Sequence, residues 1–206
     1  MNVFVAGTGT DVGKTTVAAW LCLHAKADYW KPVQTGSRLG RDAETVARLT
    51  DARCLPEAVL LPEPLSPYEA ASLAGVRIEP NAIRLPGTDR PLVVEGAGGL
   101  LVPLNGTTLL VDLIARLGLP VILAAHSSLG TINHTCLSLE ALRARDIPTL
   151  GVILSGEPNP ANREAIERFG RTAVLAELPW LDPLDRAGLA RIKPSAECLT
   201  WRMPRS

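Results

Sequence analysis

Short runs of apolar residues alternate with helical patterns along most of the chain. The runs are rich in Val, Ile and Leu and lack regular polar alternation, which is typical of strands that are buried on both faces. They predict six strands, at residues 3–6, 28–33, 91–94, 120–125, 148–154 and 172–178. Apolar residues at helical spacing predict five helices, at residues 14–26, 42–50, 108–117, 130–145 and 160–170.

This alternation predicts an α/β fold, a doubly wound and mostly parallel sheet with right-handed crossover helices on both faces. The length of 206 residues suits one domain, so the whole chain, residues 1–206, is expected to form it. The proline-rich residues 55–67 are expected to form a long loop. The segment after Lys193 carries mixed signals and predicts no element.

The first predicted strand runs into a glycine-rich loop. From residue 7 to residue 15 it reads Gly-Thr-Gly-Thr-Asp-Val-Gly-Lys-Thr, with another threonine after it. Glycines let the backbone wrap around phosphate oxygens, while Lys14 supplies a cation and Thr15 a hydroxyl for Mg²⁺ at a helix start. Five residues separate Gly7 from Gly13 and three separate Gly9 from Gly13, where the usual motif has four. The strand–loop–helix context nevertheless predicts a P-loop NTPase-type domain.

Ligands of such sheets bind outside the carboxyl ends of the strands, and further strand ends carry charges there. Lys31, which Pro32 holds in extended backbone, is either a cation for an anionic substrate or an ordinary exposed lysine. Glu95 ends an apolar strand before a glycine-rich turn, the arrangement in which a carboxylate coordinates Mg²⁺. Asp42 opens a helix and is either an N-terminal cap or first-turn residue that stabilises this helix, or a metal ligand, and the two roles do not exclude one another.

The composition restricts the partners that the chain is expected to have. A formal net charge of zero gives no basic surface for nucleic acid or an anionic membrane, and no apolar stretch approaches a membrane span. The chain starts directly in the first strand, its four cysteines form no CxxC pair, and its three histidines are scattered. These features predict a cytoplasmic protein without a zinc site, and with neither nucleic acid nor a membrane as partner.

Four segments in this order resemble the dethiobiotin synthetase family. They are the phosphate loop at 7–15, Trp-Lys-Pro-Val-Gln-Thr-Gly at 30–36, Glu-Gly-Ala-Gly-Gly at 95–99 and Leu-Gly-Thr-Ile-Asn-His at 129–134. Residues 176–181 look like the family's adenine-side loop, and the lengthened phosphate loop fits the family's pattern. The resemblance covers roughly residues 2–181, and the order of several motifs is more specific than any single one.

The resemblance implies an ATP-dependent ligase of biotin synthesis. Family members take 7,8-diaminopelargonic acid, CO₂ and MgATP, and they form dethiobiotin, ADP and phosphate through a carbamate and its mixed anhydride with phosphate. The resemblance also implies a homodimer, in which Asn133 from the neighbouring subunit reaches the substrate carboxylate.

The same resemblance implies a role for each candidate residue. Lys31 and Lys14 are the expected catalytic cations, and Thr15, Asp42 and Glu95 are the expected Mg²⁺ ligands. The substrate is expected to contact Thr10, Lys31, Thr35, Gly98 and Asn133. The nucleotide is expected to contact Gly9, Thr10, Asp11, Val12, Gly13, Lys14, Thr15, Thr16, Glu95, Gly96, Ala97, Gly98, Ser155, Leu178, Pro179 and Trp180.

Ser155 departs from the family's pattern, because many members place there an asparagine that reads adenine. A serine hydroxyl lacks the fixed donor–acceptor pair of an amide, so relaxed base selectivity is expected.

Three other classes of protein fit parts of the sequence. A switch ATPase of the partitioning or septum-positioning class usually carries a lysine directly after the first glycine of the loop, where this chain has Thr8. A cobyrinic or cobyric acid synthase needs a glutaminase domain, for which the chain is too short. A regulatory module with a decayed site is disfavoured by the intact charged residues of the strand ends.

Overall fold

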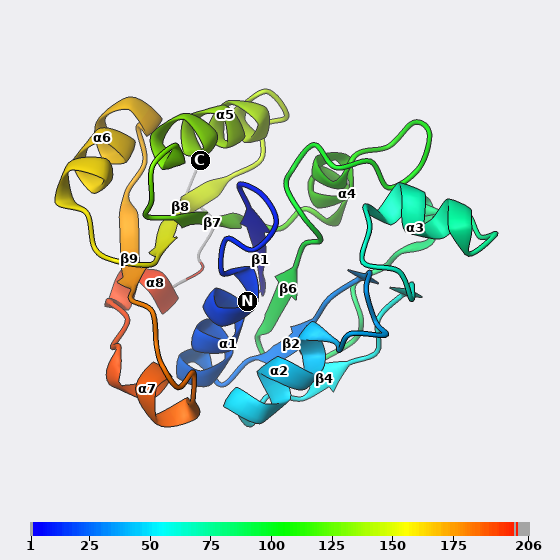
Figure 1. Cartoon of the computed structure of the whole chain (residues 1–206), viewed down its shortest axis with the longest axis horizontal. Coiled ribbons are helices and arrows are strands. Elements are labelled where there is room, and N and C mark those ends of the chain that lie inside the picture. The colour runs from blue at the N-terminus through cyan, green and yellow to red at the C-terminus, as the bar shows by residue number, and fades with distance from the viewer. Residues whose placement is uncertain (1, 200, 202–206) are drawn as a thin grey trace.

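A seven-stranded parallel sheet forms the centre of the computed structural model, which describes residues 2–199 and 201 (Figure 1). The strand order is β4-β2-β6-β1-β7-β8-β9. The strands are β1 (Asn2–Gly7), β2 (Asp28–Trp30), β4 (Cys54–Leu55), β6 (Leu92–Glu95), β7 (Val121–His126), β8 (Thr149–Ser155) and β9 (Val174–Leu178). All pairings among them are parallel, and β3 (Val33–Gln34) pairs with β5 (Val59–Leu60) in a second, small parallel sheet.

Helices cover both faces of the large sheet. One face packs against α1 (Lys14–Ala25), α2 (Asp42–Leu49), α7 (Arg186–Arg191) and α8 (Ala196–Leu199). The other packs against α3 (Pro67–Leu73), α4 (Leu110–Leu117), α5 (Thr131–Arg143) and α6 (Pro160–Gly170), and a short 3₁₀ helix, η1 (Pro80–Ala82), lies between α3 and β6 in the chain.

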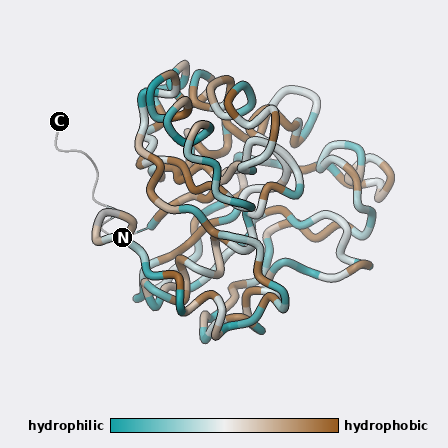
Figure 2. Tube along the Cα trace, turned by 60° about the vertical axis from the view of Figure 1, so that its left-hand side comes forward, coloured by the Kyte–Doolittle hydropathy of each residue, from teal (hydrophilic) through white to brown (hydrophobic). Residues whose placement is uncertain are grey.

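The central strand shows why two cores form. Side chains alternate along a strand, so Val3 and Val5 of β1 join the core under α1, while Phe4 and Ala6 join the core under α4. In Figure 2 the hydrophobic segments run through the interior of the trace, between outer segments that are more hydrophilic. The α/β expectation of a mostly parallel, doubly covered sheet is therefore confirmed.

Each predicted strand and helix is present, but two predictions at the edge of the sheet are wrong. Residues 28–33 form two strands, because Pro32 has no N–H to continue the ladder and its carbonyl instead accepts bonds from the backbone of Ala58 and Val59. Residues 55–67 are not one long loop: they contain β5 and lead into α3. Ser66 caps α3 by accepting from the Glu69 N–H at 3.4 Å.

The C-terminal segment also acquires structure that its sequence did not predict. Trp20 of α1 donates from Nε1 to the Ile192 carbonyl at 2.7 Å, and Trp201 is buried beside α8 in the core under α1. This segment thus closes the outer side of α1. Over residues 2–199 and 201, no helix has both the length and the apolar character needed to cross a bilayer.

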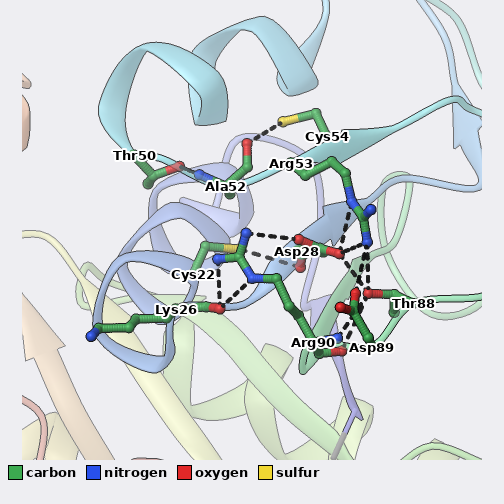
Figure 3. Close-up of polar contacts among 10 residues, drawn as sticks. All are labelled: Cys22, Lys26, Asp28, Thr50, Ala52, Arg53, Cys54, Thr88, Asp89 and Arg90. Atoms are coloured by element: carbon green, nitrogen blue, oxygen red, sulfur yellow. Dashed lines mark hydrogen bonds and ion pairs between the residues drawn. The ribbon is translucent and has the colours of Figure 1, made fainter.

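Asp28 is the first residue of β2, at the end of this strand away from Lys31, and its side chain is completely buried. Figure 3 shows its polar contacts. Arg53 donates to Asp28 Oδ2 at 2.6 and 3.1 Å, and Thr88 donates to the same oxygen. Arg90 lies 3.2 Å from Asp28 Oδ1 and also donates to the carbonyl of Lys26, the C-terminal cap of α1. Burial alone would raise the pKa of Asp28, but these hydrogen bonds and guanidinium charges outweigh it and lower the pKa.

Asp28→Asn is expected to lower the free energy of unfolding at pH 7 by about 1–3 kcal/mol, because charge-assisted hydrogen bonds are lost. The pKa of Asp28 is lowered by folding, so its stabilisation is full above the ordinary value of about 3.9 and disappears as pH falls through the folded-state pKa. Urea unfolding measures the free energy of unfolding of the variant and of the wild type. The difference between the two should be smaller at acidic pH than at neutral pH. The control is Asp89→Asn, since Asp89 is 89% exposed and lies 3.5 Å from the same Arg53. Equal losses of unfolding free energy in Asp28→Asn and Asp89→Asn would contradict the stabilising role given to the buried Asp28.

Candidate active site

Three neighbouring strands bring the predicted site residues to one edge of the sheet. β1 and β2 flank β6, and parallel neighbours end at the same edge. The segment after β1 leads to Lys14 and Thr15, Lys31 directly follows β2, and Glu95 is the last residue of β6. The start of α2 adds Asp42.

The backbone of the phosphate loop passes close to Ser155 at Gly13. This residue has φ of +84°, in the left-handed region, and a Cβ atom there would lie 2.6 Å from the hydroxyl oxygen of Ser155. Lys14 is buried and donates from Nζ to the Gly9 carbonyl at 2.6 Å. Burial lowers the pKa of Lys14, and the nearby Glu95 carboxylate opposes this only in part. The loop therefore presents a buried lysine at the start of α1.

Two carboxylates meet the Thr15 hydroxyl at the centre of the site. Thr15 Oγ1 lies 2.9 Å from Glu95 Oε1 and 3.2 Å from Asp42 Oδ1. Lys31 Nζ lies 3.2 Å from Glu95 Oε1 and also pairs with Asp42 Oδ2. Burial disfavours the charged form of Lys31, but Glu95 and Asp42 outweigh that effect and raise its pKa. Lys31 is thus a buried cation, and the interpretation of an ordinary exposed lysine is wrong.

Asp42 occupies the first turn of α2 with its carboxylate turned to Thr15 and Lys31. The N-cap position belongs to Arg41, and Asp42 is instead an acidic residue of the first turn of α2, which was the other helix-start role predicted for it. The backbone N–H of Asp42 instead donates to Gln34 Oε1 at 3.1 Å, which fixes the start of the helix against β3. Gln34 is a site residue that the sequence analysis missed, since in sequence it reads as one polar residue at a strand end.

Tyr29 is the second residue that the sequence did not reveal. Its hydroxyl donates to Glu95 Oε2 at 2.8 Å, and both side chains are buried. Burial, followed by the charge of Glu95, raises the pKa of Tyr29 well above its ordinary value, so the phenol keeps its proton. In sequence Tyr29 is an aromatic residue inside a strand, which predicts core packing and nothing more.

The oxygen donors fit a magnesium ion that arrives with a nucleotide. Mg²⁺ prefers carboxylate, hydroxyl, phosphate and water oxygens, and it rarely takes an all-protein cage. Thr15, Asp42 and Glu95 supply such oxygens, and both carboxylates lie within hydrogen-bonding distance of the Thr15 hydroxyl. Across residues 2–199 and 201, no group of three or more His, Cys, Asp or Glu side chains is arranged to hold a metal ion. Phosphate and water would complete the shell.

A cavity of about 780 Å³ opens above these residues, within the usual range of small-molecule sites. Its walls include most of the predicted site residues: Thr10, Asp11, Gly13, Lys14, Thr15, Thr16, Lys31, Thr35, Asp42, Glu95, Ala97, Gly98 and Trp180. Residues that were not predicted complete the wall, among them Gln34, Leu39, Leu65 and Val102. Trp180 is 64% exposed and stands at this wall, while the chain's three other tryptophans are buried.

The remaining predicted residues do not line this cavity. Gly9 and Val12 line a second cavity of about 290 Å³ beside the start of α5. Gly96 and Leu178 are buried, Pro179 is exposed next to Trp180, and Asn133 is exposed on α5. Ser155 is buried under the phosphate loop, with its hydroxyl toward Gly13.

Solved structures with the same fold support the interpretation of the sheet. A ParA family ATPase from Chlorobium tepidum aligns over 97% of this chain and 94% of its own, with a TM-score of 0.51 and 11% identity. The ATP complex of a Cyanothece McdA variant aligns over 93% of this chain and 87% of its own, with a TM-score of 0.51 and 14% identity. At such low identity the likeness concerns the fold alone.

Fold and site together define a P-loop nucleoside-triphosphate-binding protein. A family model described as an AAA domain matches residues 1–188. "ATP-dependent dethiobiotin synthetase BioD" of Paramagnetospirillum magneticum is 56% identical over 94% of this chain and 95% of its own, and the protein of the same name from Lawsonia intracellularis is 48% identical over 96% and 97%. The chain belongs to the dethiobiotin synthetase family.

A longer relative contains the same domain as one part. This chain is 57% identical to "Biotin biosynthesis bifunctional protein BioCD" of Bordetella avium, over 89% of its own length and 40% of that protein. The identities of 48–57% to these synthetases contrast with 11–14% to the ParA and McdA structures. The family resemblance in the sequence is therefore confirmed against the switch-ATPase alternative.

Proposed function

We propose that the protein closes the cyclic urea of dethiobiotin from 7,8-diaminopelargonic acid, CO₂ and ATP. One substrate amine attacks CO₂ and loses a proton to give a carbamate. A carbamate oxygen then attacks the γ-phosphorus of ATP, which releases ADP and leaves a carbamic–phosphoric anhydride. The second amine attacks the anhydride carbon, phosphate departs, and that amine loses a proton. One observation carries the proposal. In a chain of this family, the two buried lysines Lys14 and Lys31 line the same cavity as the carboxylates of Asp42 and Glu95.

The protein's own contribution to this reaction is charge and position. Lys14, which now donates to the Gly9 carbonyl, is the group that would turn to the terminal phosphates. Lys31 lies at the floor of the cavity, where it would stabilise the carbamate and the negative charge that builds up during phosphoryl transfer. Mg²⁺, held by Thr15, Asp42 and Glu95, would neutralise phosphate charge when bound.

No unusual general base is required in this proposal. The attacking amine and the anhydride belong to the same molecule, so the chain has only to hold that molecule in a reactive conformation. Thr10, Thr35 and Gly98 are the residues that would hydrogen-bond the carbamate or amine end, and their position in the wall of the same cavity supports this assignment. The proposed adenine-side contacts are Leu178, Pro179 and Trp180, and the exposed ring of Trp180 supports a role next to the base.

A homodimer is part of the proposal. Asn133 is assigned to the carboxylate of the substrate bound to the neighbouring subunit. The surface around it supports an interface, because Leu137 lies one helical turn further along α5 and is exposed, and Leu129 just before α5 is fully exposed.

Base selectivity is expected to be relaxed. Because Ser155 offers no amide and its hydroxyl faces Gly13, CTP and GTP should support turnover with kcat/KM close to that of ATP. Steady-state rates with the four nucleotides measure this. Ser155→Ala is the matched variant and should leave the order of preference unchanged. A strong preference of the wild-type protein for ATP would refute the prediction.

Isotope incorporation tests the proposed product directly. With ¹³C-bicarbonate, diaminopelargonic acid and MgATP, mass spectrometry should find one labelled carbon in dethiobiotin. Omission of ATP should abolish the product. Label that stays in bicarbonate while ATP is consumed would refute the proposed ring closure.

A further inference from the structure

We propose that Tyr29 is a positioning residue of the metal site, whose hydroxyl holds the Glu95 carboxylate in the orientation that binds a divalent cation. The inference rests on the proposed function, because it assigns Glu95 to the metal. It concerns a residue outside the cavity wall, so Tyr29 acts through Glu95 and touches neither nucleotide nor substrate.

The two oxygens of Glu95 have separate partners. Oε2 accepts the hydrogen bond of Tyr29 at 2.8 Å, on the buried side. Oε1 is 2.9 Å from Thr15 Oγ1 and 3.2 Å from Lys31 Nζ, on the side of the cavity. The carboxylate torsion of a glutamate is intrinsically broad, so a donor on one oxygen decides which way the other one points.

Strand register explains why Tyr29 can reach this carboxylate. Tyr29 of β2 is paired with Val93 of β6, and Glu95 follows Val93 by two residues. Side chains two residues apart share a face of the sheet, so Val93, Glu95 and Tyr29 all point to the face covered by α1. Thr15, in the first turn of α1, stands on the same face. The pairing of β2 with β6 therefore sets Tyr29 behind Glu95 and Thr15 in front of it.

Removal of the Tyr29 hydroxyl should lower the affinity of the site for the metal but should not abolish metal binding. Tyr29→Phe keeps the ring that fills the core under α1 but deletes the donor to Oε2, and it leaves a buried carboxylate less well satisfied. Loss of a group that orients a metal ligand typically costs roughly 10–100-fold in metal affinity. The affinity for the nucleotide in the absence of a divalent cation should equal that of the wild type, because Tyr29 does not line the cavity that contains the phosphate-loop residues.

The affinity of the metal site is measured with Mn²⁺. Electron paramagnetic resonance gives the concentration of free Mn²⁺ in the presence of saturating ADP. The chain has two tyrosines, so Tyr68→Phe is a natural control: Tyr68 is exposed on α3. We expect Tyr29→Phe to weaken Mn²⁺ binding by roughly 10–100-fold, with ADP affinity in EDTA unchanged, and Tyr68→Phe to match the wild type. Equal Mn²⁺ affinity in Tyr29→Phe and in the wild type would overturn the role of Tyr29 but not the proposed function. A wild-type protein that binds no Mn²⁺ would overturn the metal site of the proposed function as well.

A second measurement does not depend on the folding of the Tyr29 variant. In the Tyr68→Phe protein, Tyr29 is the only tyrosine, and its bands in the ultraviolet resonance Raman spectrum report on its hydrogen bond. Mg²⁺ added together with ADP is expected to shift these bands, since the cation withdraws electron density from the Glu95 carboxylate. An unchanged spectrum at saturating Mg²⁺ would contradict the role assigned to Tyr29.

Discussion

Lys31→Ala is expected to lower kcat by roughly 10²–10³-fold, the usual cost of removing one electrostatic contact to the developing charge. The affinity for MgADP should change far less, because the phosphate loop and Lys14 remain in place. Lys31 is buried in the cavity wall and pairs with both carboxylates, whereas Lys14, which lines the same wall, donates to the Gly9 carbonyl. Steady-state turnover and calorimetric ADP binding measure the two quantities separately. Turnover near the wild-type value would show that Lys31 has no electrostatic role.

The same substitution has a structural consequence that serves as an internal check. Without Lys31, the carboxylates of Asp42 and Glu95 face one another with their shared cation removed, and an unpaired buried charge is destabilising. The ligand-free variant should therefore melt at a lower temperature than the wild type. Mg²⁺ with ADP should restore most of this loss, since ligands that bind only the native state stabilise it. Lys193→Ala, at an exposed lysine, is the control and should change neither turnover nor stability.

Lys14→Ala is expected to act on binding, in contrast to Lys31→Ala. Each hydrogen bond from a charged group contributes about 1.5–3 kcal/mol, so the affinity for MgATP should fall by roughly tenfold to a hundredfold or more. Burial lowers the pKa of Lys14 and strips it of water, which prepares the ammonium to bind phosphate. Equilibrium binding of a non-hydrolysable ATP analogue measures the loss, with Lys193→Ala as the exposed-lysine control. Unchanged affinity in Lys14→Ala would contradict the proposed phosphate contact.

The sequence predicts the centre of the fold well because buried parallel strands have a distinctive pattern. The apolar runs of β1, β6, β7, β8 and β9 are long enough to stand out from their surroundings. β4 and β5 have two residues each, too few for any periodicity to appear, and their place depends on tertiary pairing with β2 and β3. For the same reason the proline-rich residues 55–67, which contain β5, read as a loop, although the Ser66–Pro67 pair at the start of α3 is a helix-start signal.

The site is predictable where a residue type and its position carry the chemistry. Lys14, Thr15 and Glu95 follow strands in patterns that indicate phosphate and metal binding, and the structure brings them into one cavity with Lys31 and Asp42. The residues that hold the ligands in place carry no such signal. In sequence Tyr29 looks like a core residue and Gln34 like a polar residue at a strand end. Only the strand pairing and the start of α2 show which atoms they contact.

Stabilising contacts far from the site are hidden in the sequence for the same reason. Asp28, Arg53 and Arg90 are separated by dozens of residues, and only the meeting of β2, β4 and β6 at one edge of the sheet brings them together. In sequence each is one charged residue among many. The burial of Asp28, and with it the expected acid sensitivity, follows from the topology.

Coupling of ATP hydrolysis to the diamine tests the central claim most directly. Phosphate release from MgATP is measured with bicarbonate present, with and without 7,8-diaminopelargonic acid. The account predicts release only when the diamine is present, at a rate equal to the formation of dethiobiotin. Phosphate release of equal rate without the diamine would contradict it and would indicate a switch-type ATPase on the same fold.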